Sequence, residues 1–153
     1  MQNEVQDQMC STFMEVVEKL AFMFGEVVPK DEVDSPDIPF TLASMSFDGD
    51  VKGLLSVAVP TEMTAEIAAN ILGLEPEDIG SEDMMNDALA EMLNVVCGHV
   101  IMALVGTGAN FKLDSPLTCP VDKMTYDHMV KSDEFVGLLL DDSPVFLGLK
   151  LEN

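Results

Sequence analysis

The residues of this sequence best suited to chemistry are an acid and an amide about one helical turn apart. Glu91 and Asn94 lie in a long apolar segment, and Asp87 precedes them by another turn. At about 100° per residue, these three fall with Gly98 in one stripe along a helix. A carboxylate accepts hydrogen bonds or pairs with a cation, whereas a carboxamide both donates and accepts. Together they can hold a positive group and orient a water molecule, which hydrolysis of an activated phosphate requires.

The segment that carries the stripe, residues 81–106, has the local signals of a helix. Ser81 suits an N-cap, and Glu82 and Asp83 place negative charge in the first turn. Gly106 and Gly108 end the helix. We expect one side of it to face the core through Met85, Leu89, Met92, Val96, Val100 and Ala103.

Two interpretations of the stripe remain open at this point. Spacing alone favours the simpler one, in which a mostly buried helix exposes one solvated line. Apolar residues border the stripe on both sides, however, and this suits a docking surface better than a solvated face.

The pattern Asp87-x-x-x-Glu91-x-x-Asn94 resembles the active-site motif of the CheC/CheX family of bacterial chemotaxis phosphatases. That motif has Asp or Ser, then Glu, then Asn at these intervals, and a proline a little over twenty residues later. Pro116 falls there, give or take one position. The resemblance covers nearly the whole chain, and the single intact motif is closest to the CheX type.

The resemblance implies a function for each residue of the stripe. The substrate would be the aspartyl phosphate of a CheY-like response-regulator receiver domain, which carries its own magnesium ion. Glu91 would pair with a receiver lysine, and Asn94 would align the attacking water. Gly98 would let the partner backbone approach, and Asp87 would add a polar contact. Independently of the resemblance, Met84 is a candidate partner contact because methionine side chains are flexible and apolar. No cofactor would be held by this chain.

Two further properties and an alternative follow from the same resemblance. CheX-type proteins associate as homodimers, so we expect a homodimer formed through an edge strand. The process served would be two-component signalling in the cytoplasm. The alternative is a non-catalytic adaptor or scaffold that docks a signalling or flagellar-switch protein through the same helix face.

Composition sets the outer limits. The 153 residues suit one domain, 1–153, and 48% are hydrophobic. The formal net charge of -21 argues against binding nucleic acid or an anionic membrane. We see no signal peptide and no membrane-spanning run. The 3 cysteines fit reduced thiols in the cytoplasm, and no zinc site is expected because Cys97 and His99 would lie about 200° apart on a helix.

A first long helix is expected over residues 5–24, ended by Gly25. It carries a second stripe at the same spacing, in which Glu18 replaces the amide and Phe22 the glycine. Because an ionised carboxylate cannot donate a hydrogen bond, we interpret this stripe as an inactive copy of the motif. Its members are Ser11, Glu15, Glu18 and Phe22.

The remaining segments predict hairpins. A linker over 27–39 leads to strands 40–47 and 52–59 joined by Asp48-Gly49-Asp50, then a short helix over 61–73. Residues 110–114 predict a strand, 121–132 at most an irregular strand through 124–126, and 134–140 with 145–151 a second hairpin. Each half thus has a long helix, an Asp-Ser-Pro segment (34–36, 114–116) and a hairpin. We expect an α+β fold, with both long helices packed on a largely antiparallel sheet.

Overall fold

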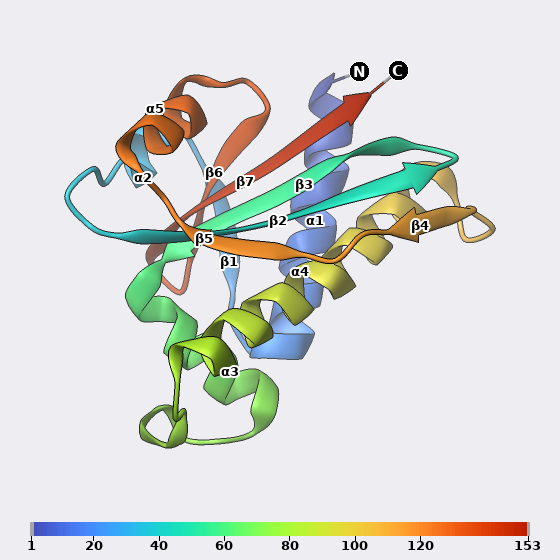
Figure 1. Ribbon diagram of the computed structural model, residues 1–153. Coiled ribbons are helices and arrows are strands. Elements are labelled where there is room, and N and C mark those ends of the chain that lie inside the picture. The colour runs from blue at the N-terminus through green and yellow to red at the C-terminus, as the bar shows by residue number, and fades with distance from the viewer. Residues whose placement is uncertain (1, 153) are drawn as a thin grey trace.

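A computed structural model describes residues 2–152, which build a seven-stranded antiparallel sheet with helices on both faces (Figure 1). The sheet order is β1-β6-β7-β3-β2-β4, and β5 also pairs with β2. The strands are β1 Gly25–Val28, β2 Phe40–Gly49, β3 Lys52–Pro60, β4 Phe111–Leu113, β5 Leu117–Pro120, β6 Phe135–Leu140 and β7 Ser143–Glu152. The helices are α1 Gln2–Ala21, α2 Lys30–Val33, α3 Thr64–Leu72, α4 Glu82–Val105 and α5 Lys123–Lys131, with short 3-10 turns at Thr61–Met63 and Pro76–Asp78. The expected α+β fold is confirmed.

The two faces of the sheet are covered unequally. The two long helices α1 and α4 lie on one face, and the shorter α2 and α5 cover part of the other (Figure 1). Because successive strand residues point to opposite faces, Met45 and Phe47 pack toward the long helices. Phe40 and Phe146 instead pack with Tyr126 of α5, at ring centroid distances of 5.7 Å. The stripe of Asp87, Glu91, Asn94 and Gly98 therefore belongs to the face with the larger core.

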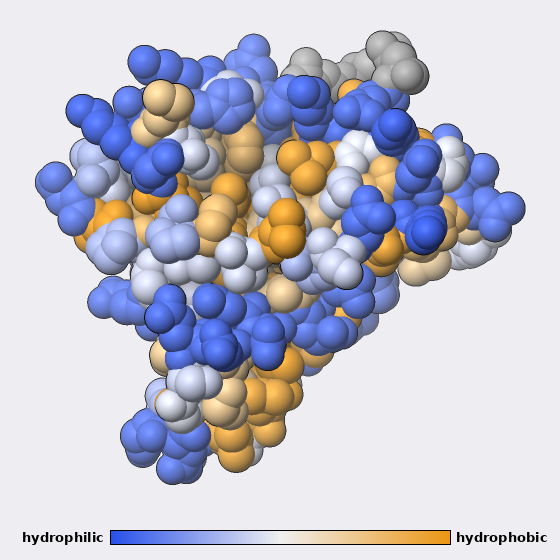
Figure 2. Space-filling view, in the orientation of Figure 1, coloured by the Kyte–Doolittle hydropathy of each residue, from blue (hydrophilic) through white to orange (hydrophobic). Residues whose placement is uncertain are grey.

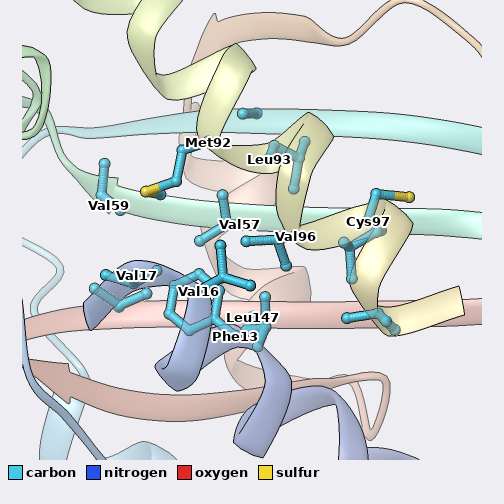
Figure 3. Packing of buried hydrophobic residues seen from close by; sticks show 14 of the residues in the cluster. Phe13, Val16, Val17, Val57, Val59, Met92, Leu93, Val96, Cys97 and Leu147 are labelled. Atoms are coloured by element: carbon cyan, nitrogen blue, oxygen red, sulfur yellow. The ribbon is translucent and has the colours of Figure 1, made fainter. Parts of the chain in front are cut away.

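Helix α4 is held to the sheet by its inner side. Met92, Leu93 and Val96 are fully buried and pack with Phe13 of α1 and Leu147 of β7 (Figure 3). Each such side chain contributes about 1.5–3 kcal/mol by leaving water. Burial of the inner side fixes the rotation of the helix about its axis, and this presents the opposite stripe outward.

The ends of α4 differ from its middle. Met85 is only half-buried and Ala103 is exposed, although both were expected in the core. Met85 lies against α3, where the Thr64 hydroxyl donates to its sulfur at 3.3 Å, and Ala103 lies beside α1, where the Gln8 side chain donates to its carbonyl at 3.4 Å. By length and composition alone, α4 could cross a membrane. The expectation that the sequence contains no such run is therefore wrong for this segment. Here α4 packs against α1, α3 and β2 as a core helix of the fold.

Helix α1 ends three residues earlier than expected. It stops at Ala21, and Phe22 adopts a positive φ of 58°, which a side-chain-bearing residue rarely does. This turn directs Met23 into the core and leaves Phe24, expected as the last residue of the helix, 65% exposed. Gly25 was expected to end the helix because glycine is the usual residue at such a turn.

Two segments without expected regular structure contain elements. The expected linker over 27–39 contains the end of β1 and all of α2. β1 forms because it pairs with β6, more than a hundred residues away. Residues 121–132, expected at most as an irregular strand, contain helix α5. Asp122 caps α5 by accepting a hydrogen bond from the Thr125 amide at 2.8 Å, and Tyr126 and Met129 are its buried positions.

The two halves of the chain correspond as the pseudo-repeat predicts. β3 pairs with β7 at the centre, β2 and β6 flank them, and β1 and β4 with β5 form the edges. The two Asp-Ser-Pro segments do not occupy equivalent places, however. Residues 34–36 follow α2, whereas 114–116 lie between β4 and β5 and precede α5.

Candidate functional site

The outward stripe of α4 begins two turns after a well-formed helix start. Ser81 is the N-cap, and its hydroxyl oxygen accepts a hydrogen bond from the Met84 amide at 3.2 Å. Asp87 and Glu91 are exposed, and Asn94 is half-buried. All three side chains therefore point away from the core, as the helical spacing predicts.

These side chains form one wall of an open cleft of about 440 Å³. The opposite wall is formed by residues 113–116 at the junction of β4 and β5, which run beside α4 in Figure 1. Met45 of β2 is nearly fully buried and lies at the base. The cleft lining is Met45, Asp87, Ala90, Glu91, Asn94, Leu113, Asp114, Ser115 and Pro116. Pro116, placed in the motif by sequence spacing, thus faces the acid and amide across the cleft.

The second wall contains an irregularity in strand pairing. Phe47 pairs with Leu113 and Ser44 with Leu117, so two residues of β2 lie opposite three, 114–116. One extra residue against a partner strand is a β-bulge, a device common beside active sites. The Ser46 hydroxyl donates a hydrogen bond of 2.6 Å to Asp114 Oδ2, and the Asp114 amide donates one of 3.0 Å to the Ser46 carbonyl.

The charge of the cleft is negative and unpaired. Asp87, Glu91 and Asp114 all line it, and within residues 2–152 neither Glu91 nor Asp87 has an ion pair or hydrogen bond. The amide of Asn94 is equally without a partner in that part of the chain. Across the same residues no three His, Cys, Asp or Glu side chains gather in a way that could hold a metal ion. The arrangement suits a cationic partner group.

The other residues of the expected site lie around the cleft. Gly98 is half-buried one turn beyond Asn94, and a β-carbon added there would meet no atom within 4 Å. The surface above Gly98 is therefore open to an approaching partner. Met84 is half-buried in the first turn of α4, outside the cleft lining. Its partner contact stays a prediction.

The second stripe, on α1, is also outward-facing. Ser11, Glu15 and Glu18 are exposed, and Phe22 lies just past the end of the helix. The structure thus keeps the acid of the motif on this face but offers no amide at its last position.

Two buried cysteines, Cys10 of α1 and Cys97 of α4, belong to the main core. Burial raises the pKa of the Cys97 thiol to about 12, and burial together with the nearby Asp7 carboxylate raises that of Cys10 to about 11. Both thiols are therefore protonated at neutral pH and serve as small core residues, not as nucleophiles.

Met45 and Asp114 were missed as residues of the site. Their membership depends on the pairing of β2 with β4 and β5, which joins segments nearly seventy residues apart. The one local signal was the Asp-Ser-Pro segment, since proline inside a strand marks an edge or a bulge.

Comparison with known proteins gives a consistent result. The family model described as chemotaxis phosphatase CheX matches residues 41–138, and no curated protein matches the sequence. Two similar solved structures are CheX proteins from Desulfovibrio desulfuricans and Vibrio vulnificus, each with a TM-score of 0.71. They are 15% and 16% identical, covering 97% and 99% of this chain and 99% of each of theirs.

A third similar structure is a complex. It is described as CheX-CheY-BeF3-Mg+2 from Borrelia burgdorferi, with a TM-score of 0.67 and 14% identity. The match covers 96% of this chain and 97% of that one. At these identities, the solved structures establish a shared fold.

Proposed function

Because the chain belongs to the CheX family of chemotaxis phosphatases, we propose that it hydrolyses the aspartyl phosphate of a CheY-like receiver domain. In this reaction water attacks phosphorus, the bond from phosphorus to the aspartate oxygen breaks, and inorganic phosphate leaves. The observation that carries the proposal is the open cleft, in which Glu91 and Asn94 face Pro116 with no partner in residues 2–152.

Asn94 is proposed to orient the attacking water. Its carboxamide oxygen can accept a hydrogen bond from water while its NH₂ group donates to a phosphoryl oxygen. Asn94 is half-buried in the wall of the cleft, so fewer rotamers are available to its side chain than to those of the exposed acids. A pre-positioned amide of this kind lowers the barrier without supplying new covalent chemistry.

Glu91 is proposed to dock the partner. Its carboxylate is exposed, lies one turn from Asn94 and is unpaired in residues 2–152. A lysine of the receiver can therefore pair with it as the two surfaces meet. Asp87 and Asp114 extend the same negative surface and would steer a basic partner toward the cleft.

The partner is proposed to bring the metal. A magnesium ion on the receiver would neutralise charge that develops on the phosphoryl oxygens. This chain would contribute the amide, the acid and a wall that excludes water, and would hold no cofactor of its own. We place the reaction in the cytoplasm, where receiver domains act.

The structure described from Borrelia burgdorferi supports the proposed partner, because it joins a protein of this fold to CheY with magnesium. The competing function is an adaptor that docks a signalling or flagellar-switch protein through the same face. Both functions use the stripe for binding, but only hydrolysis uses the amide of Asn94 on a water molecule.

The test is to mix the purified chain with a panel of phosphorylated receiver domains and follow phosphate release. We expect a cognate receiver to lose phosphate at least about tenfold faster with the chain than alone. A rate increase of this size is small for one well-positioned catalytic group. A receiver that binds the chain with its own slow hydrolysis unchanged would favour the adaptor. Unchanged hydrolysis and no binding across the panel would contradict both.

A further inference from the structure

We propose that Ser46 is a positioning residue that acts through Asp114 to set the wall of the cleft opposite Asn94. The inference rests on the proposed function and extends it to a residue of β2 outside the motif. Its basis is the bulge at residues 114–116, which is pinned at one point by a side chain of the neighbouring strand.

The pin consists of two hydrogen bonds between the same two residues. The Ser46 hydroxyl donates to Asp114 Oδ2 at 2.6 Å, and the Asp114 amide donates to the Ser46 carbonyl at 3.0 Å. The side-chain bond goes to a charged acceptor, which makes it stronger than a bond between neutral groups. Asp114 is the first residue of the bulge, so the pin fixes where the strand leaves its register.

The bulge needs such a pin because its other residues cannot hold it. Pro116 has no amide hydrogen to donate to the ladder. Ser115 is exposed, and its side chain has no hydrogen bond in the part of the chain that the structure describes. Regular pairing resumes only at Leu117, opposite Ser44. Between Asp114 and Leu117 the wall thus depends on its two ends.

The position of this wall matters for the reaction because it faces the amide. Pro116 and Asn94 line the same cleft, so a shift of the bulge would widen or narrow the space in which a phosphoryl group and its water must fit. Misplacement by about 1 Å can cost a hundredfold in rate. Glu91, which is proposed to dock the receiver, is on the other wall and would keep its place.

The test compares Ser46→Ala with Ser44→Ala as a matched control. Ser44 is two residues away on the same face of β2, is equally half-buried, and has no side-chain hydrogen bond in residues 2–152. We expect Ser46→Ala to lower kcat for receiver dephosphorylation at least about fivefold, with KM changed less than about twofold. Ser46→Thr, which keeps the hydroxyl, should restore most of kcat.

A second readout does not depend on activity. Hydrogen exchange at the Asp114 amide should speed up in Ser46→Ala, because the segment opens more easily without the pin. The backbone N–H of Asn110, which donates to Asp50 Oδ2 at 2.8 Å, serves as the internal control and should exchange at the wild-type rate.

The outcomes separate this inference from the proposed function. A wild-type protein that accelerates no receiver would refute the proposed function, while exchange at Asp114 would still report on the pin. If the wild type is active and Ser46→Ala keeps its kcat, or if Ser44→Ala loses as much, the positioning role is wrong. Unchanged exchange at Asp114 in Ser46→Ala would likewise overturn it.

Discussion

At the scale of single residues, the site joins local and distant contributions. Asp87, Glu91 and Asn94 could be placed from sequence because helical spacing alone decides that they share a side. Their outward direction was predicted from the apolar residues on the opposite side of the helix. Burial of those residues in the core confirms it. Asp114 could not be placed, because strand register with a bulge is not encoded within a short segment.

Glu91→Ala should weaken receiver docking more than it slows the reaction of bound receiver. The variant removes an exposed carboxylate that is proposed to pair with a lysine, and such pairs contribute about 0.2–1 kcal/mol when exposed and more when desolvated. We expect the dissociation constant for the receiver to rise at least about twofold, and the dependence of that constant on salt concentration to become weaker than in the wild type. Titration calorimetry with the receiver, alongside Glu66→Ala on α3 as a control, checks this. Binding of Glu91→Ala at wild-type strength at every salt concentration would contradict the proposed pairing with a lysine.

At the scale of elements, local signals succeeded where an element is self-contained. The N-cap Ser81 and the terminal Gly106 define α4 as the sequence indicates. Helix α5 was missed, although Asp122 at its start and the spacing of Tyr126 and Met129 were visible signals. Strand β1 carried no comparable signal, because its regular structure depends on β6.

Gly98 provides a test of α4 as a docking surface. It is in the helix interior with open space around it, so Gly98→Ala should stabilise the fold by about 0.5–1 kcal/mol. The added methyl group would nevertheless stand where the partner backbone is proposed to approach. Urea denaturation should thus show a gain in stability while receiver affinity falls.

A control separates this effect from helix propensity. Asn86→Ala raises propensity on the same helix outside the cleft lining and should leave affinity unchanged. Undiminished affinity of Gly98→Ala would refute the close approach at this position.

The hydrogen bonds that join Tyr126 of α5 to the residues after α2 should make the free energy of unfolding depend on pH. The Tyr126 hydroxyl donates to Asp34 Oδ1 at 2.5 Å and accepts from the Ser35 amide. Burial, with the hydrogen bond to Asp34, raises the pKa of Tyr126 to about 12. A raised pKa means that the protonated form is favoured by folding. Its contribution is complete below about pH 10, the unfolded value, and is lost as the pH rises toward 12.

Tyr126→Phe is the variant that measures this contribution. It should lower the free energy of unfolding by about 1 kcal/mol at neutral pH. The difference in the free energy of unfolding between wild type and Tyr126→Phe should shrink between pH 10 and 12. Urea denaturation at each pH measures this difference. A difference that stays constant over that interval would contradict the coupling.

At the scale of the whole molecule, the sequence predicted the fold class because two hairpins and two long amphipathic helices allow few arrangements. The second helical layer was not predicted, since α2 and α5 are short.

The surface is largely hydrophilic, in keeping with the high net charge of the chain. Figure 2 shows hydrophilic side chains over much of the face in view, with hydrophobic ones gathered at the lower end near α3. Leu72 and Leu74 are exposed in that region.

The homodimer remains a prediction, and its salt dependence should be opposite to that of receiver docking. Two chains of formal net charge -21 repel each other, so salt should strengthen their association. Light scattering at micromolar concentration should give about twice 16.6 kDa, with the dimer fraction rising as salt increases. A monomer at all salt concentrations would contradict the prediction.

The most direct test of the account is the single-turnover rate of phosphate loss from a cognate receiver held at saturating concentrations of the protein. Saturation removes docking from the measurement, so the rate reports on the orientation of water alone. Wild type and Asn86→Ala should give the same accelerated rate, and Asn94→Ala, with its fold intact by circular dichroism, should fall to the rate of the receiver alone. Undiminished acceleration by Asn94→Ala would contradict the central claim that this amide performs the chemistry.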